Sequence, residues 1–181
     1  MSAPRPADAG RPPRGSRKVA KPHFLESAAG ISPGPLFRTR RVVRFSDCDP
    51  AGIVFFPQYM VMLNGVVEEW FDEGLKIPYA ELIGVRRTGL PTVRLELDFS
   101  AISRHGDELV WSLAIERLGR SSLTLAVQVH GGHGGAELPA LPELRLQARQ
   151  VLVCTSLHTH RPQVLPDDVR SALTPYVRAA A

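Results

Sequence analysis

The sequence predicts an α+β fold in which one long helix packs against an antiparallel sheet. Three observations predict it: a strand pattern comes first, a helical pattern of about four turns follows, and about four strand-like apolar runs then succeed one another. Strands that follow one another through short turns pair antiparallel, and a helix with one apolar stripe must bury that stripe against the sheet. The chain of 181 residues is slightly over the usual size of one domain, so we expect one folded unit.

Residues 1–36 differ in composition from the rest of the chain. They hold six of the 22 basic residues, two of the 18 acidic residues and seven of the 16 prolines. The segment therefore carries the whole net charge of +4, and residues 37–181 sum to zero. With so few apolar side chains to bury, we predict a disordered, basic, Pro-rich tail. Binding to nucleic acid or an anionic surface, or organelle targeting, stays open for the tail, but we expect no nucleic-acid partner for the neutral body.

The composition also excludes several classes of protein. No apolar run approaches the roughly 20 residues of a membrane-spanning helix, so we expect no membrane partner. Cys48 and Cys154 are too few for a disulfide framework, and no apolar segment follows the N-terminal charges to form a secretory signal. We therefore expect a protein of the reducing cytoplasm.

The first half of the folded body holds one strand and one long helix. Alternation from Phe37 to Phe45 predicts a strand with one charged side, and residues 46–52 have the composition of a turn. A second, short helix is possible over residues 79–87. The long helix ends near Gly74, and its apolar stripe consists of Tyr59, Met62, Leu63, Val66, Val67, Trp70 and Phe71.

The second half of the body is dominated by strands. Residues 118–121 have the composition of a hairpin turn, and the Gly-rich residues 131–142 form a flexible connection. A short C-terminal helix begins at Pro166-Asp167-Asp168, where proline and acidic residues favour a helix start. The predicted strands cover residues 93–99, 109–118, 122–130 and 144–157.

The residues that carry chemistry are expected between the first strand and the long helix. Asp47 and Asp49 bracket Cys48, and the Pro-Ala-Gly that follows favours a turn. One interpretation is a plain turn that an aspartate caps. The other is a reactive carboxylate, because the apolar residues 53–56 follow directly where the helix begins, and such surroundings shift the reactivity of an acid. The pattern alone leaves both open.

The segment Phe45–Tyr59, which reads FSDCDPAGIVFFPQY, closely resembles the signature of hotdog-fold acyl-CoA thioesterases of the 4-hydroxybenzoyl-CoA thioesterase type. The resemblance runs from about Phe37 to Tyr176 and leaves the tail outside. It implies a hotdog thioesterase domain over residues 37–181, in which an antiparallel sheet wraps a long central helix. It also implies subunits paired through their sheets, as dimers or tetramers, with active sites at the subunit boundary.

The resemblance further implies the catalytic roles. Asp49 is the catalytic carboxylate, acting as nucleophile on the thioester carbonyl or as general base for a water. The backbone N–H of Phe56 matches the position of the family's oxyanion donor. Asp47 is expected to fix the turn. No cofactor is expected. His158 and His160 share a strand face but lack further ligands at a convincing spacing, so we expect no metal.

Three further positions are implied to bind the substrate. Asn64 stands where the family has an acid that meets a ring hydroxyl, and Tyr79 stands where an aromatic lines the acyl pocket. Arg120, with Arg117 as a second candidate, lies in the hairpin turn that holds the CoA phosphates. The alternative interpretations are a solvated helix residue for Asn64, a core aromatic for Tyr79 and a solvated hairpin residue for Arg120.

The implied function is hydrolysis of an aryl- or other small acyl-CoA thioester to free acid and CoA. Asp49 and its Pro-Ala-Gly turn favour it. The alternative is a non-hydrolytic hotdog protein that binds acyl-CoA or a partner, which the sparse basic cluster and the tail support. A hydratase or dehydratase is disfavoured, because no histidine and acid are suitably placed on the loop before the helix.

Overall fold

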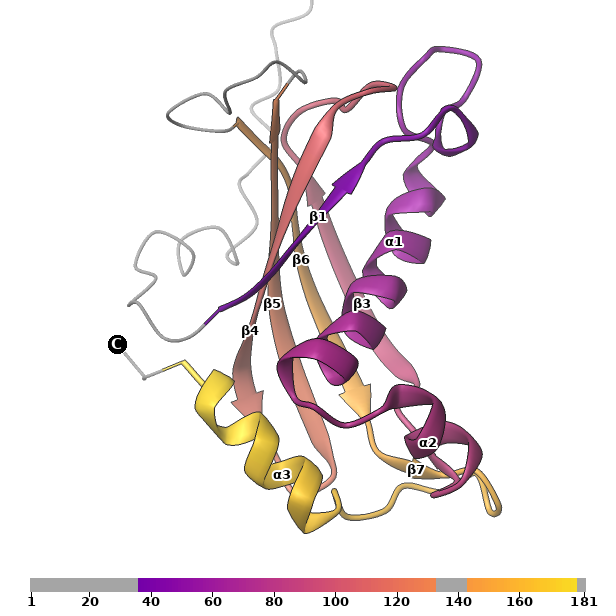
Figure 1. Ribbon diagram of the computed structural model, residues 1–181, viewed down its shortest axis with the longest axis vertical. Coiled ribbons are helices and arrows are strands. Elements are labelled where there is room, and N and C mark those ends of the chain that lie inside the picture. Colours follow the sequence, from indigo (N-terminus) through magenta and orange to yellow (C-terminus); the bar gives the residue numbers. More distant parts are fainter. Residues whose placement is uncertain (1–35, 133–142, 179–181) are drawn as a thin grey trace, which may run out of the picture. The chain divides into compact units, whose positions relative to one another are not determined.

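The structure, a computed structural model, describes residues 36–132 and 143–178. Except for Leu36, the predicted tail lies outside the described residues, as does most of the predicted Gly-rich connection. A five-stranded antiparallel sheet in the order β1-β4-β5-β6-β3 curves around one long helix, α1 (Figure 1). The α+β hotdog fold is therefore confirmed. The strands of this sheet are β1 (Phe37–Val42), β3 (Thr92–Phe99), β4 (Glu108–Leu118), β5 (Ser122–Gly132) and β6 (Glu143–Val153).

Helix α1 (Phe56–Glu69) passes directly into a π-helical turn, η3 (Trp70–Gly74), so the helical segment ends at the glycine that the sequence predicts. The Leu75 N–H donates to the Trp70 carbonyl at 2.8 Å, which is the i→i−5 bond of a π turn. The whole predicted apolar stripe is buried, with no member more than 8% exposed.

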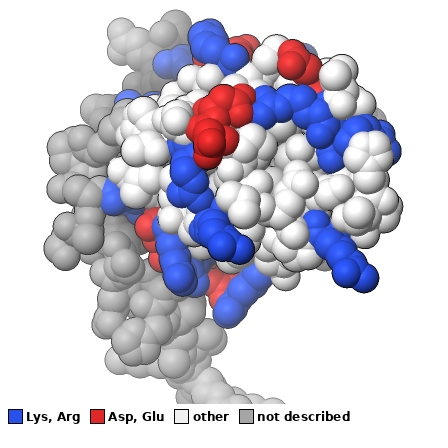
Figure 2. Space-filling view, turned by 90° about the horizontal axis from the view of Figure 1, so that it is seen from below, with Lys and Arg blue, Asp and Glu red and all other residues white. Residues whose placement is uncertain are grey.

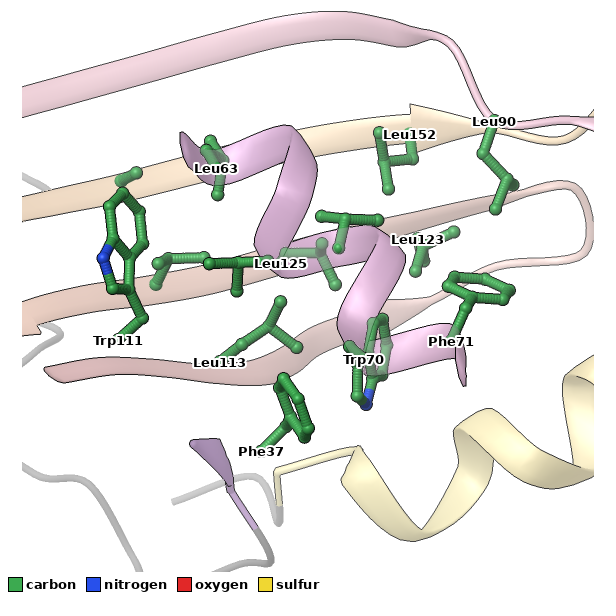
Figure 3. Packing of buried hydrophobic residues seen from close by; sticks show 14 of the residues in the cluster. Phe37, Leu63, Trp70, Phe71, Leu90, Trp111, Leu113, Leu123, Leu125 and Leu152 are labelled. Carbon is green, nitrogen blue, oxygen red and sulfur yellow. The ribbon is translucent and has the colours of Figure 1, made fainter. Parts of the chain in front are cut away.

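The stripe of α1 and η3 packs on the concave face of the sheet (Figure 3). Leu63, Trp70 and Phe71 point toward leucines of β4 and β5, among them Leu113 and Leu125, and all of these side chains are at most 1% exposed. Burying each of these side chains stabilises the fold by roughly 1.5–3 kcal/mol. The packing fixes the helix on the sheet and thereby fixes the position of the turn that precedes it.

Two predicted strands are shorter in the structure. The first ends at Val42, because the chain turns through a 3-10 helix, η2 (Phe45–Asp47), in which Asp47 Oδ2 accepts the Arg44 N–H at 2.7 Å. The predicted strand over residues 144–157 ends at Val153, because the next N–H, that of Cys154, donates to the Ser121 carbonyl at 2.8 Å. Beyond Cys154 the chain forms a separate two-stranded sheet, in which β7 (Thr155–Ser156) pairs with β2 (Thr88–Gly89).

Two short helices lie at the end of the sheet where β7 is found (Figure 1). They are α2 (Tyr79–Gly84) and α3 (Asp167–Leu173), which begins where the sequence predicts a C-terminal helix. Arg86, just after α2, donates two hydrogen bonds to the Asp168 carboxylate at 2.7 and 2.8 Å and so ties α2 to α3. In the described part of the chain, no helix is long and apolar enough to cross a membrane.

The ion pair between Arg86 and Asp168 predicts a small loss of stability in acid. The hydrogen bonds from Arg86 hold the pKa of Asp168 below its usual value. A carboxyl group with a lowered folded-state pKa stabilises the fold above its unfolded pKa, about 3.9, and this stabilisation is lost as the pH falls through the folded-state pKa. Because the Asp168 side chain is 58% exposed, solvent screens the pair and we expect no more than about 1 kcal/mol.

Thermal melts of the native chain and of Asp168→Asn check this expectation. The native chain should have the higher Tm near neutral pH, and the difference between the two should shrink as the pH falls below about 3.9. A difference in Tm that is as large in strong acid as at neutral pH would contradict it.

Candidate active site

Asp49 builds the turn that precedes α1 with its own hydrogen bonds. Its Oδ1 accepts the Ala51 N–H at 2.8 Å, and its carbonyl accepts the Gly52 N–H at 2.9 Å. Its N–H donates to the Ile53 carbonyl at 2.9 Å. Gly52 has a φ of +76°, the left-handed conformation that side chains rarely adopt. The Pro-Ala-Gly sequence thus folds the chain back on itself and holds the Asp49 side chain in one place.

Asp47 closes the same turn from the other side. Besides binding the Arg44 N–H through its carboxylate, it accepts the Phe55 N–H with its carbonyl at 2.9 Å. The Val54 N–H donates to the Ser103 carbonyl at 2.9 Å, which ties the turn to the connection between β3 and β4. These contacts are the structural role predicted for Asp47.

The Asp49 carboxylate has one oxygen available for chemistry. The side chain is half-buried, and Oδ1 is engaged with Ala51. Within residues 36–132 and 143–178, Oδ2 has no hydrogen-bond or ion-pair partner. The carboxylate is therefore held by one oxygen and open at the other.

Phe56 is the first residue of α1, and its backbone N–H is one of the amides that a helix leaves without an intrahelical partner. Pro57 has no N–H, and the Gln58 N–H already donates to the Phe55 carbonyl at 2.8 Å. The Phe56 N–H therefore remains as an available donor in this turn, at the positive end of the helix dipole. The residue as a whole is 55% exposed.

A pocket of about 290 Å³ opens further along α1. It brings together Asn64 and Tyr79, the two residues expected to contact an acyl group. Tyr79 is half-buried against Phe71, with ring centroids 5.4 Å apart, and burial together with the charge of Glu68 raises the pKa of its hydroxyl. The pocket is lined by Asn64, Val67, Glu68, Tyr79, Leu90, Pro91, Thr92, Gln150 and Leu152.

Three polar residues of this pocket, Glu68, Thr92 and Gln150, were not singled out from the sequence. Glu68 lies outside the apolar stripe of the helical pattern. Gln150 is one of several polar residues in the predicted strand over residues 144–157. One feature of the sequence indicates that Gln150 faces the core: it alternates with Ala148 and Leu152, which are both buried there.

Arg120 lies in the turn between β4 and β5 and is exposed. Its carbonyl accepts the Leu165 N–H and an Arg170 guanidinium N–H, both at 3.0 Å, so the backbone of the turn is fixed while the Arg120 side chain is not. Arg117, at the same end of β4, is exposed as well. Figure 2 shows basic side chains spread over this end of the molecule, with a smaller patch of acidic side chains among them.

One chain does not bring Asp49 and its own pocket together. Asn64 lies eight residues after Phe56 in the same helix, which is about 12 Å along the helix axis. The acid and the oxyanion donor stand at the N-terminal end of α1, whereas the pocket lies toward its C-terminal end. A substrate that uses both must therefore reach along the helix or take the two parts from different chains.

The cysteines and histidines that the structure describes form no competing site. Burial, together with the charges of Asp47 and Asp49, raises the pKa of the Cys48 thiol, which keeps it protonated and a weak nucleophile. Cys154 is 0% exposed and packs in the core as a small apolar side chain, as expected. Among the described residues, no group of three or more His, Cys, Asp or Glu side chains is placed to hold a metal ion.

A central helix wrapped by a five-stranded antiparallel sheet, with an acidic turn at the helix start, defines the class of hotdog thioesterases. Residues 43–173 match the Thioesterase-like superfamily, and the chain belongs to this family. The protein is thus a thioester hydrolase.

Two relatives match different lengths of this chain. The 1,4-dihydroxy-2-naphthoyl-CoA hydrolase of Synechocystis sp. is 25% identical over 137 residues, covering 76% of this chain and 94% of the relative. The 4-hydroxybenzoyl-CoA thioesterase of Pseudomonas sp. strain CBS-3 is 31% identical over 81 residues, covering 44% of this chain and 57% of the relative. The solved structure of the 4-hydroxybenzoyl-CoA thioesterase from that strain has the same fold, with a TM-score of 0.68, 23% identity, and coverage of 76% of this chain and 98% of that one.

Proposed function

We propose that the protein hydrolyses the CoA thioester of an aryl or other small acyl group to the free acid and CoA. The observation that carries this proposal is the turn at the start of α1. Among the described residues, this turn holds the Asp49 carboxylate by one oxygen, leaves the other oxygen without a partner, and ends in the Phe56 N–H, which has no intrahelical partner.

In this proposal the Asp49 carboxylate acts in one of two ways. It attacks the thioester carbonyl, giving a transient anhydride that water then hydrolyses, or it removes a proton from the water that attacks. In both routes the C–S bond breaks, the CoA thiolate leaves and takes up a proton, and negative charge develops on the carbonyl oxygen. The Phe56 N–H donates to that oxygen, and the helix dipole stabilises its charge.

The pocket sets the size of the acyl group. Its volume of about 290 Å³ lies at the small end of the roughly 300–1,000 Å³ range of small-molecule sites, which favours one or two rings over a long chain. Tyr79 offers an aromatic wall, and Asn64 offers an uncharged hydrogen-bonding group. The named relatives act on 4-hydroxybenzoyl-CoA and on 1,4-dihydroxy-2-naphthoyl-CoA, which are both aryl thioesters.

We further propose that each complete site is shared between two chains of a homodimer, free or within a tetramer. Strand β3 lies at an edge of the sheet and exposes Val93 and Phe99 by 60% and 50%. Pairing of this edge with a second copy about a two-fold axis runs the two central helices in opposite directions. The turn of one chain then approaches the pocket of the other. A cytoplasmic location stays part of the proposal, and the two free thiols agree with it.

Arg120 is proposed to contact a CoA phosphate, because a guanidinium fits phosphate geometry. We expect Arg120→Ala to raise KM for a CoA thioester by about fivefold, with kcat little changed, since an exposed charge pair contributes about 1 kcal/mol. The same variant should hydrolyse the N-acetylcysteamine thioester of the same acid as well as the native enzyme does, because that ester has no phosphate. Arg38→Ala, at an exposed arginine of β1, serves as the control. An equal loss with both esters would show that Arg120 does not act through phosphate.

The experiment that tests the proposed function is thiol release, followed with a disulfide dye, from a panel of aryl, phenylacetyl and short to medium aliphatic CoA thioesters. We expect clear turnover with aryl or other small acyl groups. Binding of a thioester without release of thiol would overturn hydrolysis and establish the non-hydrolytic alternative.

A further inference from the structure

Gln150 occupies a position where the fold calls for an apolar side chain. It lies opposite Leu95 of β3 and Leu125 of β5, and residues that oppose each other in an antiparallel pair share a face of the sheet. Leu125 is 0% exposed in the core under α1, so Gln150 faces the helix. The Gln150 side chain is itself only 2% exposed. A buried amide in such a position destabilises the fold unless its polar atoms are paired.

Only one end of this amide is paired. The Gln150 Nε2 donates to the Thr92 hydroxyl at 2.8 Å, which fixes the orientation of the amide. Its Oε1 is buried and has no hydrogen-bond partner among the described residues. Buried polar atoms without a partner are uncommon in folded proteins, and each calls for an explanation. Here both Gln150 and Thr92 line the 290 Å³ pocket, so the residue that carries the unpaired oxygen forms part of the pocket wall.

The helix side of the pocket adds a second acceptor. Glu68 lines it from α1, one helical turn beyond Asn64. The pocket therefore presents a carboxylate on the helix side and an unpaired amide oxygen on the sheet side, and both accept hydrogen bonds. A purely apolar acyl group would leave Gln150 Oε1 unpaired and, once water is displaced, would leave Glu68 less solvated.

We infer that Gln150, oriented by Thr92, is a specificity-determining residue that selects acyl groups bearing a hydroxyl. The hydroxyl donates to Gln150 Oε1 across the pocket from Asn64 and Glu68. This inference rests on the proposed function, since it assigns the pocket to the acyl group of that reaction. It places the selective contact on the sheet rather than on the central helix.

The test measures binding, so that it does not depend on turnover. The probes are phenacyl-CoA, a thioether that cannot be hydrolysed, and its 2-, 3- and 4-hydroxy derivatives, titrated by calorimetry into the full-length native protein. One hydroxy derivative should bind about tenfold or more tightly than phenacyl-CoA, because a buried acceptor left unpaired is costly. In Gln150→Met, which fills the same space without the acceptor, this preference should fall to about one, while phenacyl-CoA binds at least as tightly as before.

Gln147 provides a matched control on the same strand. It is also a buried glutamine, 7% exposed, whose Oε1 has no partner among the described residues. It opposes Asp98 and Gln128, however, and so lies on the other face of the sheet, away from the pocket. Gln147→Met should leave the hydroxyl preference unchanged. Thermal melts without ligand confirm that both variants fold, and Gln150→Met should melt no lower than the native chain, because it removes an unpaired polar group from the core.

The outcomes separate this inference from the proposed function. Equal affinity of the native protein for all four probes, or a preference that persists in Gln150→Met, would overturn the role of Gln150 whether or not the enzyme hydrolyses thioesters. A preference that disappears in Gln150→Met and persists in Gln147→Met supports it, even where the thiol-release panel shows no turnover.

Discussion

Replacing Asp49 by asparagine should lower kcat for CoA thioester hydrolysis by about 10²–10⁴-fold, the range that a positioned acid–base group contributes. The variant isolates the charge, because the asparagine Oδ1 can still accept the Ala51 N–H and thus keep the turn. An amide is a poor nucleophile and a poor base, so the variant loses either the attacking carboxylate or the base that activates the attacking water. Pre-steady-state thiol release with saturating substrate measures the loss at the chemical step.

Asp47→Asn is the matched control for Asp49→Asn. It makes the same change two residues earlier and keeps an oxygen for the Arg44 N–H. We expect kcat within a few-fold of native. Equal losses in the two variants would show that the turn tolerates neither change and would remove the catalytic assignment of Asp49.

The second large effect is expected from Phe56→Pro, which should lower kcat by about 10²–10³-fold, the range measured for loss of one oxyanion donor in other enzymes. Proline is favoured at the first position of a helix, where its fixed φ suits the fold and no intrahelical bond is lost. Phe55 has a φ of −64° and a ψ of 121°, an extended conformation that the residue before a proline prefers. The substitution therefore deletes one N–H with little change to the backbone.

Phe56→Ala separates the N–H from the ring at the same position. It removes the 55% exposed side chain but keeps the donor, so kcat should stay within a few-fold of native. Rates are compared on the aryl thioester that the panel identifies, with helical content checked by circular dichroism. A full rate in Phe56→Pro, or an equal loss in Phe56→Ala, would mean that the backbone N–H is not the oxyanion donor.

The sequence predicts the parts of this fold that short-range patterns determine. The apolar stripe of α1 repeats at helical spacing, and its end at Gly74 is recognisable because glycine disfavours a helix. The turn at Asp49 is predicted by four consecutive residues, Asp-Pro-Ala-Gly, because Asp, Pro and Gly each favour a turn conformation. The π turn over Trp70–Gly74 could not be predicted in this way. A π turn and an α turn differ only in whether the N–H bonds to the carbonyl five or four residues earlier, and tertiary packing selects between them.

The pocket was predicted only in part, for a related reason. Asn64 and Tyr79 were placed by resemblance to a family, not by their own pattern. Gln147 and Gln150 both interrupt β6. The alternation with Ala148 and Leu152 favours Gln150 as the one that faces the core, but the pairing with β3 and β5 that places it beside Thr92 is not given by the sequence. Glu68 is an exposed residue of α1, and the helical spacing of the sequence does not show which other segments form a pocket beside it.

The separation of the acidic turn from the pocket along α1 has a genetic consequence under the proposed pairing. Each site takes its acidic turn from one chain and its pocket from the other. A mutation in the turn and a mutation in the pocket therefore inactivate different parts of a site. When the two damaged chains pair with each other, one of their two sites combines an undamaged turn with an undamaged pocket. Two inactive alleles in one cell would then restore partial activity to each other, whereas two mutations in the same part would not.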